Sequence, residues 1–267
     1  MMKVKNKFAA EDHTFVVCAY KESVFLEECI KSLLSQTVKT RVIISTSTPN
    51  SWISDIADKF SLAVYINTGK KGISGDWDFA ISCVNTALVT LAHQDDIYEP
   101  NYIENMLDYM NKAENPILFS CAYSELRDDE KVTLNRLLSI KRILAFPMRV
   151  FPDSIAFRRF GLSFGNCICC PSVTYITDII REHPFESELK SNLDWLQWEK
   201  LSKLKGSFLY SSKKLMCHRI HSDSETSRIL QNNMRYSEDL IVFQKFWPNI
   251  LAKRLAKLYS ASEKSNY

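Results

Sequence analysis

The first half of the chain alternates between short apolar runs and longer stretches in which apolar residues recur at helical spacing. Short apolar runs bounded by polar or glycine-containing turns are typical of strands buried on both faces. Such runs predict strands at residues 15–19, 42–44, 62–66, 87–92 and 117–121. Apolar positions three or four residues apart predict helices at residues 22–36, 53–60, 76–84 and 99–112.

This alternation of strands and helices predicts an α/β fold with a mostly parallel, Rossmann-like sheet flanked by helices. Ligands of such sheets bind beyond the carboxyl ends of the strands, so the residues that follow each strand are the first candidates for chemistry. The alternation ends near Arg127, and the stretch Leu134–Phe160 mixes arginine and lysine with apolar residues. We expect irregular structure and helices there, followed by a basic, amphipathic helical tail over Phe243–Tyr259.

Composition narrows the class of protein. The 267 residues suffice for one large domain or two small ones, and the 46% that are hydrophobic exclude a disordered chain. The net charge is +3, from 34 basic and 31 acidic residues. This balance argues against a nucleic-acid partner.

Eight cysteines are scattered along the chain. We expect reduced thiols and a cytoplasmic protein, because residues 1–12 do not form a signal peptide and no apolar run is long enough for a membrane span. The cluster Cys167, Cys169 and Cys170 is compatible with zinc, but no second pair stands at a usual ligand spacing. We favour the interpretation that these are small, buried apolar side chains.

The end of the fourth predicted strand is the first candidate site, because its apolar run stops abruptly at His93, Gln94, Asp95 and Asp96. Adjacent carboxylates repel each other unless a cation or water neutralises them. At a strand end, a divalent metal such as Mg²⁺ or Mn²⁺ suits carboxylate oxygens and commonly holds a phosphate as well. The alternative is a solvated turn in which Asp96 caps the next helix, and spacing alone does not decide between the two.

The second candidate is Asp194, at the start of a helix that carries Trp195 and Trp198. A carboxylate among indoles is partly desolvated, which raises its pKa and suits it to act as a general base. A favourable interaction with the helix macrodipole explains the same position without any chemistry. From the residues alone, this structural explanation is preferred.

Two histidines near the end of the second half are a third candidate. His218 and His221 stand three residues apart, before acids and hydroxyls at residues 222–226. This arrangement suits a metal or a diphosphate, and it also suits a surface loop.

The fourth candidate is the stretch Gly69–Ala80, where glycines and lysines precede a predicted helix. A helix N-terminus can receive a phosphate, although the spacing of a Walker loop is missing here. Asp76 and Asp78 oppose an anion and instead suit the hydroxyl groups of a sugar or ribose.

Taken together, these segments resemble the large family of inverting glycosyltransferases with the GT-A fold, often called family 2. The resemblance covers roughly Thr14 to Thr226. The opening strand and helix of that family are similar to FVVCAYKESVFLEECIKSLLSQT, and its metal-binding strand end is similar to LAHQDDIYEP. Its catalytic-base segment resembles NLDWLQWEKL, its late histidine segment HRIHSDSETS, and its acceptor-side stretch GNCICCPSVTYIT.

The chain departs from the usual pattern of the family on the donor side. Cys18-Ala19-Tyr20-Lys21 stands where a Pro-Thr-Tyr-Asn-type segment is usual, and His93 replaces the first aspartate of the metal motif. Ser45-Thr46-Ser47-Thr48 stands where an aspartate usually reads the nucleotide base. Asp78 stands near an asparagine that is common in the family, and Trp77 near a basic residue. The family's way of recognising its nucleotide therefore does not transfer directly to this chain.

The resemblance implies a role for each candidate residue. Asp194 is the implied catalytic base, with Leu193 in place of the family's glutamate. The implied ligands of a Mn²⁺ or Mg²⁺ ion are Asp95, Asp96 and His221, with His218 as an extra histidine. The implied donor-binding residues are Ala19, Tyr20, Glu22, Thr46, Asp76, Asp78, His93, Gln94 and Asp95. Asn166 and Trp195 are expected on the acceptor side.

The implied reaction moves a sugar from a nucleotide-diphosphate donor to an acceptor hydroxyl with inversion, in polysaccharide or other cell-surface glycan synthesis. A nucleotidyltransferase is a rival, but the glycine- and arginine-rich loop that it needs after the first strand is missing. A catalytically silent module that binds nucleotide sugars is a second rival, and the presence of Asp194 argues against it.

The acceptor is expected to be a glycan or a lipid-linked sugar. Peripheral contact with the inner face of the membrane, through Lys141–Phe160 and the basic tail, is one interpretation, and a packed helical subdomain is the other. The expected parts of the chain are a nucleotide-sugar-binding half, an acceptor-side and catalytic-base half, and a helical tail, at residues 1–125, 126–230 and 231–267.

Overall fold

The computed structural model describes residues 7–70, 72–185, 189–221 and 234–264. The strands are β1 (His13–Ala19), β2 (Arg41–Thr46), β3 (Val64–Ile66), β4 (Leu88–His93), β5 (Ile97–Tyr98), β6 (Pro116–Arg127), β7 (Glu130–Val132), β8 (Thr174–Ile176) and β9 (Ser207–Ile220). The helices are α1 (Leu26–Leu34), α2 (Ser51–Phe60), α3 (Ile73–Ser82), α4 (Tyr102–Lys112), α5 (Arg136–Val150), α6 (Ile155–Leu162), α7 (Thr177–Glu182), α8 (Leu193–Leu201), α10 (Met234–Phe243) and α11 (Asn249–Lys264), with 3₁₀ turns η1 (Ala10–Asp12) and η2 (Cys170–Ser172).

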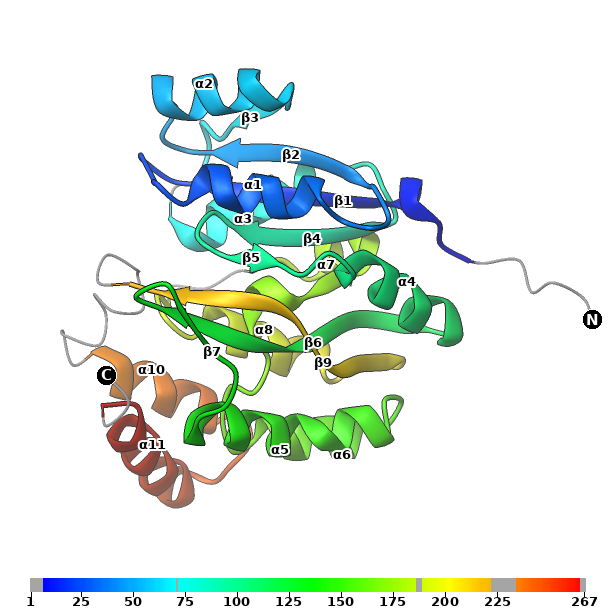
Figure 1. Cartoon of the computed structure of the whole chain (residues 1–267). Coiled ribbons are helices and arrows are strands. Elements are labelled where there is room, and N and C mark those ends of the chain that lie inside the picture. Colours follow the sequence, from blue (N-terminus) through cyan, green and yellow to red (C-terminus); the bar gives the residue numbers. More distant parts are fainter. Residues whose placement is uncertain (1–6, 71, 186–188, 222–233, 265–267) are drawn as a thin grey trace, which may run out of the picture.

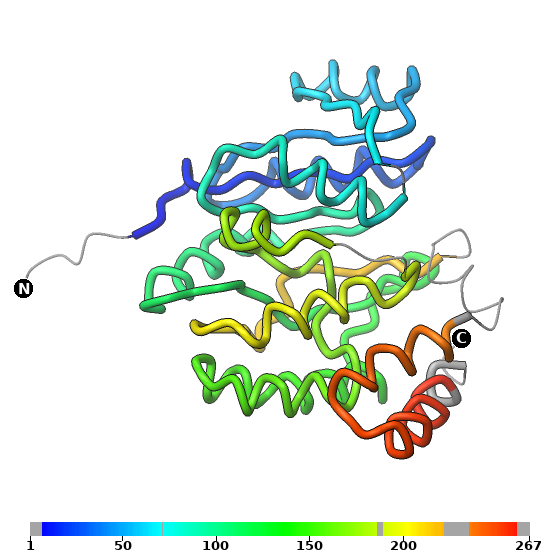
Figure 2. The backbone as a smooth tube through the Cα atoms, turned by 180° about the vertical axis from the view of Figure 1, so that it is seen from behind, coloured from blue at the N-terminus to red at the C-terminus, as the bar shows by residue number. Residues whose placement is uncertain are grey.

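Within the described residues, nine strands join in one twisted sheet with helices on both faces (Figure 1). The order is β3-β2-β1-β4-β8-β6-β9-β5, and β7 pairs with β6. Figure 2, seen from behind, shows α10 and α11 together at one lower corner, beside the helices that precede them. The α/β class with a mostly parallel, helix-flanked sheet and a helical C-terminal extension is therefore confirmed.

The first half of the sheet forms as the hydrophobic pattern predicts. β1 pairs in parallel with β2 and with β4, and β2 pairs in parallel with β3. Alternate residues of β1 enter different cores, Val16 on one face and Phe15 and Val17 on the other. Burial on both faces explains why these strands are continuous apolar runs rather than alternating ones.

Two predicted helices are shorter than their apolar spacing indicates. The helix predicted from residue 22 begins at Leu26, after a turn in which Lys21 has a φ of 56°. The helix predicted from residue 99 begins at Tyr102, because Ile97–Tyr98 first pairs with β9 as strand β5. In both places the extra residues form a loop that follows a strand end.

The second half contains strands that the hydrophobic pattern does not predict. β8 lies between β4 and β6 and is antiparallel to both, so the fourth and fifth predicted strands are not adjacent. β9 pairs in parallel with β6 along its length, and the pairing steps from Ser211 to Lys214 opposite Cys121 and Ala122. The two residues inserted at this bulge interrupt the two-residue alternation of the strand. For this reason the hydrophobic pattern does not predict β9.

The tail is a pair of helices rather than one amphipathic stretch. α10 ends at Phe243 and α11 begins at Asn249, with Trp247-Pro248 in the turn between them. Proline lacks the backbone N–H that a continuing helix needs, which accounts for the break. Among the helices described, none combines the length and the apolar character needed to cross a membrane.

The cysteines behave as small apolar side chains. All eight are free, and six of them are buried, including the cluster Cys167, Cys169 and Cys170. The division of the chain at residues 125 and 230 stays a prediction.

Candidate active site

Several strands end at one edge of the sheet, and the candidate residues follow those ends. β6 runs in the same direction as β4, because β8 is antiparallel to both. β9 runs parallel to β6, so its last residues return to the edge where β4 ends at His93. The arrowheads of β2 and β9 point to the same side of the molecule in Figure 1. Strand order, rather than sequence distance, thus brings His218 and His221 to His93–Asp96.

Asp95 is bonded by residues from both halves of the chain. Nε2 of His221 lies 3.0 Å from its Oδ2. The guanidinium Nε of Arg219 donates to its backbone carbonyl at 3.0 Å. Burial alone would raise the pKa of the Asp95 carboxyl, but the hydrogen bond from His221 and the charges of His93 and His218 outweigh burial and lower it. Asp95 therefore stays ionised well below neutral pH.

The neighbouring carboxylate, Asp96, is fully buried. Its Oδ1 is 2.9 Å from Nδ1 of His218 and accepts a hydrogen bond, also 2.9 Å long, from the backbone N–H of Arg219. Burial would lower the pKa of His218, but the charges of Asp96 and Asp95 and the hydrogen bond to Asp96 raise it. Asp96 Oδ2 has no hydrogen-bond partner within the described residues and lies 3.9 Å from Nδ1 of His93.

His93, Asp95 and Asp96 form a group with the spacing of a metal site. One candidate ligand atom from each of them lies within 4.8 Å of those of the other two. Nε2 of His93 is buried and also lacks a hydrogen-bond partner among the described residues. Orphaned polar atoms are rare in folded proteins, so this pair of them beside an ionised carboxylate fits a divalent cation.

Arg219 is a residue of this edge that the sequence patterns did not single out. Besides bonding the carbonyl of Asp95, it forms ion pairs with Glu28 at 2.5 Å and with Asp129 at 3.1 Å. Its guanidinium lies 4.3 Å from the ring centre of Phe25, and that ring lies 5.1 Å from the ring of His221. Arg219 therefore connects α1, β9 and the loop after β4, and it fixes the position of the Asp95 backbone.

Asp194 lies in the first turn of α8 in a different environment. Its Oδ2 accepts a hydrogen bond from Nδ2 of Asn166 at 2.8 Å, and its Oδ1 accepts one from the N–H of Trp195 at 2.7 Å. Burial raises the pKa of Asp194 and outweighs the opposing effect of these two hydrogen bonds. The structure thus brings Asn166 and Asp194 together.

The pKa values of the Cys169 and Cys170 thiols respond to both acidic groups. Burial is the main cause that raises the pKa of each thiol, and the charges of both Asp96 and Asp194 raise it further.

The segment after β1 is held against the segment after β4. The side-chain amide of Gln94 accepts from the N–H of Tyr20 at 2.9 Å and donates to its carbonyl at 3.0 Å. This pair of bonds imitates one more step of the β1–β4 ladder. The other predicted donor-side residues of these segments differ in exposure. Ala19 and Thr46 are buried, and Glu22 is exposed. The hydroxyl of Thr46 accepts a hydrogen bond from the N–H of Thr48.

Asp76 lies where β2 ends, although it comes from α3. Its Oδ2 accepts from the hydroxyl of Ser47 at 2.9 Å, and its Oδ1 accepts from Nδ2 of Asn67 at 2.7 Å. Asp76 thus places a carboxylate beside Ser45–Thr48, the segment that has no aspartate of its own where the family usually has one. Asp78, two residues further along α3, instead accepts a hydrogen bond from the backbone N–H of Phe185 at 2.8 Å.

Sequence comparison identifies the family. The profile described as glycosyl transferase family 2 matches residues 14–171, which is more than half of the chain. The chain belongs to glycosyl transferase family 2. The expected activity class, that of a glycosyltransferase, is therefore confirmed.

Curated relatives of this family 2 chain carry the same class name. An uncharacterized glycosyltransferase of Rickettsia prowazekii is 24% identical over 246 residues, which cover 90% of this chain and 71% of that protein. One of Rickettsia conorii is 22% identical over 249 residues, covering 92% of this chain. The chain spans only 39% of the length of that second relative.

Two solved structures share the fold of this family 2 chain. TarS of S. aureus, residues 1–349 in complex with UDP-GlcNAc, superposes with a TM-score of 0.65 at 12% identity, covering 91% of this chain and 70% of that one. The mannosyltransferase PcManGT of Pyrobaculum calidifontis, in complex with GDP-Man and Mn²⁺, gives a TM-score of 0.60 at 12% identity, covering 98% of this chain and 79% of that one. The expected GT-A fold is therefore confirmed.

The structure places two tryptophans of this family 2 chain, Trp77 and Trp195, in the core, which corrects the acceptor-side role expected of Trp195. The indole of Trp195 is fully buried and donates from Nε1 to the carbonyl of Leu162, so it is not available to stack on an acceptor sugar. Trp77 is also buried, and its ring stacks on the imidazole of His93 with centres 5.3 Å apart. Trp77 therefore packs against a candidate ligand, His93.

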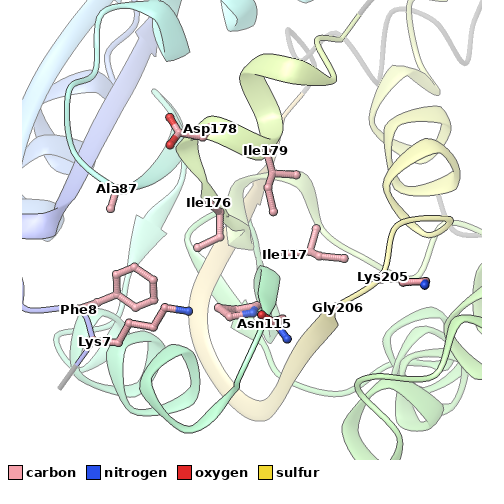
Figure 3. A pocket seen from close by; sticks show the side chains of 11 residues that line it. Lys7, Phe8, Ala87, Asn115, Ile117, Ile176, Asp178, Ile179, Lys205 and Gly206 are labelled. Atoms are coloured by element: carbon pink, nitrogen blue, oxygen red, sulfur yellow. The ribbon is translucent and has the colours of Figure 1, made fainter. Parts of the chain in front are cut away.

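Two sequence features that we considered lie in part beyond the residues that the structure describes, and one pocket lies away from the site. Lys71 and the acids and hydroxyls at residues 222–226 lie outside the described residues. The pocket in Figure 3 is lined by Ala87, Asn115 and Gly206, which directly precede or open β4, β6 and β9. It lies at the amino ends of these strands, away from the edge that carries His93–Asp96, so we assign the chemistry to the opposite edge.

Proposed function

We propose that this family 2 glycosyltransferase moves a sugar from a nucleotide-diphosphate donor to an acceptor hydroxyl with inversion of configuration. The observation that carries the proposal is the group His93, Asp95 and Asp96, with ligand atoms within 4.8 Å, at the carboxyl edge of the sheet. Nucleotides bind at this edge in open α/β sheets. Two of the structural neighbours contain a nucleotide sugar, UDP-GlcNAc in one and GDP-Man with Mn²⁺ in the other.

The side chains at this edge suit a divalent cation, Mn²⁺ or Mg²⁺. Asp95 and Asp96 would supply carboxylate oxygens, and His93 and His221 are the imidazoles in position to complete the set. When bound, such an ion would stabilise the negative charge that gathers on a departing diphosphate. The protein's own contribution is to keep Asp95 ionised through His221 and to hold the loop still through Arg219.

Asp194 is the residue that we assign as catalytic base. Its raised pKa favours acceptance of a proton from the acceptor hydroxyl as that oxygen attacks the sugar. Attack from the face opposite to the leaving group inverts the anomeric centre, and the base must then lie on the acceptor side. Asn166 holds the carboxylate in one orientation by donating to Oδ2, so we assign it to the acceptor side as a positioning residue.

The donor side is assigned to the residues that follow β1, β2 and β4. Asp76 is our candidate to contact hydroxyl groups of the nucleoside, because Ser47 and Asn67 present it beside the end of β2. The backbone at Tyr20, fixed by Gln94, faces the same edge. The remaining members of this proposed donor-binding set are Ala19, Glu22, Thr46, Asp78, His93 and Asp95.

For the acceptor we propose a cell-surface polysaccharide or a related glycan, free or linked to a lipid. This part of the proposal rests on analogy with the family. A binding screen is the most direct way to identify the donor. The melting temperature is measured with each of a panel of nucleotide sugars, with and without Mn²⁺. The proposal requires a cation-dependent rise in melting temperature for at least one of them.

Turnover separates the proposal from its rivals. The donor selected by the screen is incubated with the enzyme in radiolabelled form, and release of nucleoside diphosphate is followed. A transferase releases the diphosphate and passes on the sugar, whereas a nucleotidyltransferase releases pyrophosphate from a nucleoside triphosphate. Donor binding without any release in the presence of candidate acceptors would instead favour a silent binding module.

A further inference from the structure

The hairpin of α5 and α6 exposes an unusual number of large apolar side chains. The hairpin is antiparallel and tight, since a Cβ on Gly161 would lie 2.3 Å from the carbonyl oxygen of Leu144. We define the hairpin surface as the exposed apolar side chains of residues 134–164: Leu134, Ile140, Ile143, Phe146, Val150, Phe151, Ile155, Phe157, Phe160 and Phe164. A monomeric protein rarely leaves so many large apolar side chains together in water.

α5 carries two apolar faces instead of one. Its inner face packs Leu138, Ala145 and Met148 into the protein. Its outer face repeats apolar residues at the same helical spacing, with Ile143 70% and Phe146 55% exposed. One apolar stripe suffices for a helix that only covers a core, so the outer stripe needs another explanation.

In α6 an arginine faces the interior and phenylalanines face the solvent, which is the reverse of an ordinary surface helix. Arg158 is fully buried, where its guanidinium donates to the backbone carbonyls of Ser202, Leu204 and Gly206. On the other side, Phe160 is 58% exposed. Arg158 of α6 thus bonds internal carbonyls, while aromatic rings of the helix face outward.

The charge around the hairpin surface is positive. Residues 133–164 contain six basic side chains and a single acid, Asp153, which accepts a hydrogen bond from Ser207. Arg136 and Arg149 are exposed at the surface, and within the described residues neither has an ion-pair partner. The adjoining α11 is also basic, with Lys253, Arg254 and Lys257 exposed and no acid between 240 and 260.

These helices share one end of the molecule. Figure 1 and Figure 2 both show α5, α6 and α11 along its lower end, opposite to β3 and α2. The ring of Phe164 lies 5.5 Å from that of Trp247, at the turn before α11, which makes the apolar surface continuous with the basic tail. Apolar and aromatic side chains flanked by arginine and lysine are the composition of helices that lie in a membrane interface.

We propose that the hairpin surface docks on an anionic lipid bilayer, with its aliphatic and phenylalanine side chains inserted at the level of the headgroups. The positive charge complements an anionic leaflet, and it would oppose a second copy of the same basic surface. The proposal does not depend on the donor or on the reaction, because it concerns the end of the molecule formed by α5 and α6.

Vesicle sedimentation tests the proposal. The full chain is mixed with vesicles of phosphatidylcholine alone or of phosphatidylcholine with phosphatidylglycerol, and the bound fraction is measured at low and high salt. We expect binding to the mixed vesicles that salt weakens. The double variant Ile143→Asp/Phe160→Asp should bind them at least about tenfold more weakly, because both changed side chains lose their apolar insertion.

The control variant is Ile66→Asp on β3, at the other end of the sheet, where Ile66 is 48% exposed. It should bind vesicles as the wild type does, and the double variant should keep the wild-type melting temperature, because both of its positions are exposed. The variant Arg136→Glu/Arg149→Glu tests the charge separately and should lose only the preference for anionic vesicles. Absence of wild-type binding to any vesicle overturns the proposal. A dimer in light scattering that Ile143→Asp/Phe160→Asp dissociates, without vesicle binding, overturns it in favour of a self-association surface.

Discussion

The carboxylates at the end of β4 and the carboxylate at the start of α8 have opposite electrostatic surroundings. Asp95 lies within hydrogen-bond distance of His221, and Asp96 within hydrogen-bond distance of His218 and of the backbone N–H of Arg219. The pKa of Asp95 is lowered despite burial. Asp194 is met by one side-chain amide and one backbone N–H, and burial raises its pKa. The first region keeps its negative charge, which suits a cation, and the second has the raised pKa that suits exchange of a proton. This difference is the basis of the roles proposed above.

The largest expected effect is on transfer by Asp194→Asn. An asparagine keeps the shape and a hydrogen bond to Asn166 but cannot accept the acceptor's proton. We expect the rate of transfer to fall by about a hundredfold to ten-thousandfold, with donor affinity unchanged. Steady-state rates and calorimetric donor binding are both measured.

Asp178→Asn is the matched control for this variant, because Asp178 also lies in the first turn of a helix and is exposed. It should transfer sugar at the wild-type rate. Near wild-type turnover by Asp194→Asn would show that Asp194 is only a helix N-terminal charge.

The next effect is on donor binding by Asp95→Asn. Loss of this ionised oxygen should lower the affinity for the donor in the presence of Mn²⁺ by about a hundredfold or more, because charge compensation at the diphosphate is lost. The control is Asp55→Asn, an exposed acid on α2. Equal Mn²⁺ dependence of binding in Asp95→Asn and the control would contradict the assignment of the cation site.

A smaller effect is expected from Arg219→Met. The change removes the bond to the Asp95 carbonyl and the ion pairs with Glu28 and Asp129, but it leaves the carboxylates in place. Supporting residues around a metal site commonly contribute about tenfold to a hundredfold in affinity, so donor affinity with Mn²⁺ should fall within that range. Lys112→Met also removes one positive charge, from the exposed pair with Asp108, and should leave this affinity as it is.

Much of the first region could be predicted from the sequence. The end of β4 was visible because a run buried on both faces stops at polar residues, and His93, Asp95 and Asp96 follow it directly. Arg219 was missed because its partners come from positions far away in the chain, at Glu28 and Asp129. Such bonds depend on the position of β9, and the bulge after Ser211 hides the period of that strand.

The second region was harder to predict. The first turn of a helix is a common place for an aspartate, so position alone could not distinguish Asp194 from a helix charge. Its distinguishing features are burial and the bond to Asn166, which need the packing of the loop after α6 against α8. Trp195 shows the limit of the resemblance, which placed it on the acceptor side, whereas it packs in the core as most aromatic residues do.

The smallest expected effect is a difference in the pH dependence of stability. At pH values between the ordinary pKa of an aspartate, about 3.9, and the raised pKa of Asp194, the folded protein binds more protons at this position than the unfolded chain. The contribution of Asp194 to the free energy of unfolding therefore falls as the pH rises through this window. The melting temperature of Asp194→Asn relative to that of the wild type should therefore rise as the pH is raised above about 4.

The same shift predicts the acid limb of the activity. Transfer should fall as the pH drops through the raised pKa of Asp194, because the protonated carboxyl cannot act as a base. The midpoint should lie above about 3.9, the value of an exposed aspartate. A midpoint at or below that value would contradict the burial argument.

The division of labour between the two regions is tested most directly by titrating the donor, with Mn²⁺, into Asp95→Asn and Asp194→Asn side by side in a calorimeter. We predict wild-type affinity for Asp194→Asn and strongly weakened binding for Asp95→Asn. Equal affinities for the two variants would contradict the assignment of the cation and the donor diphosphate to the end of β4.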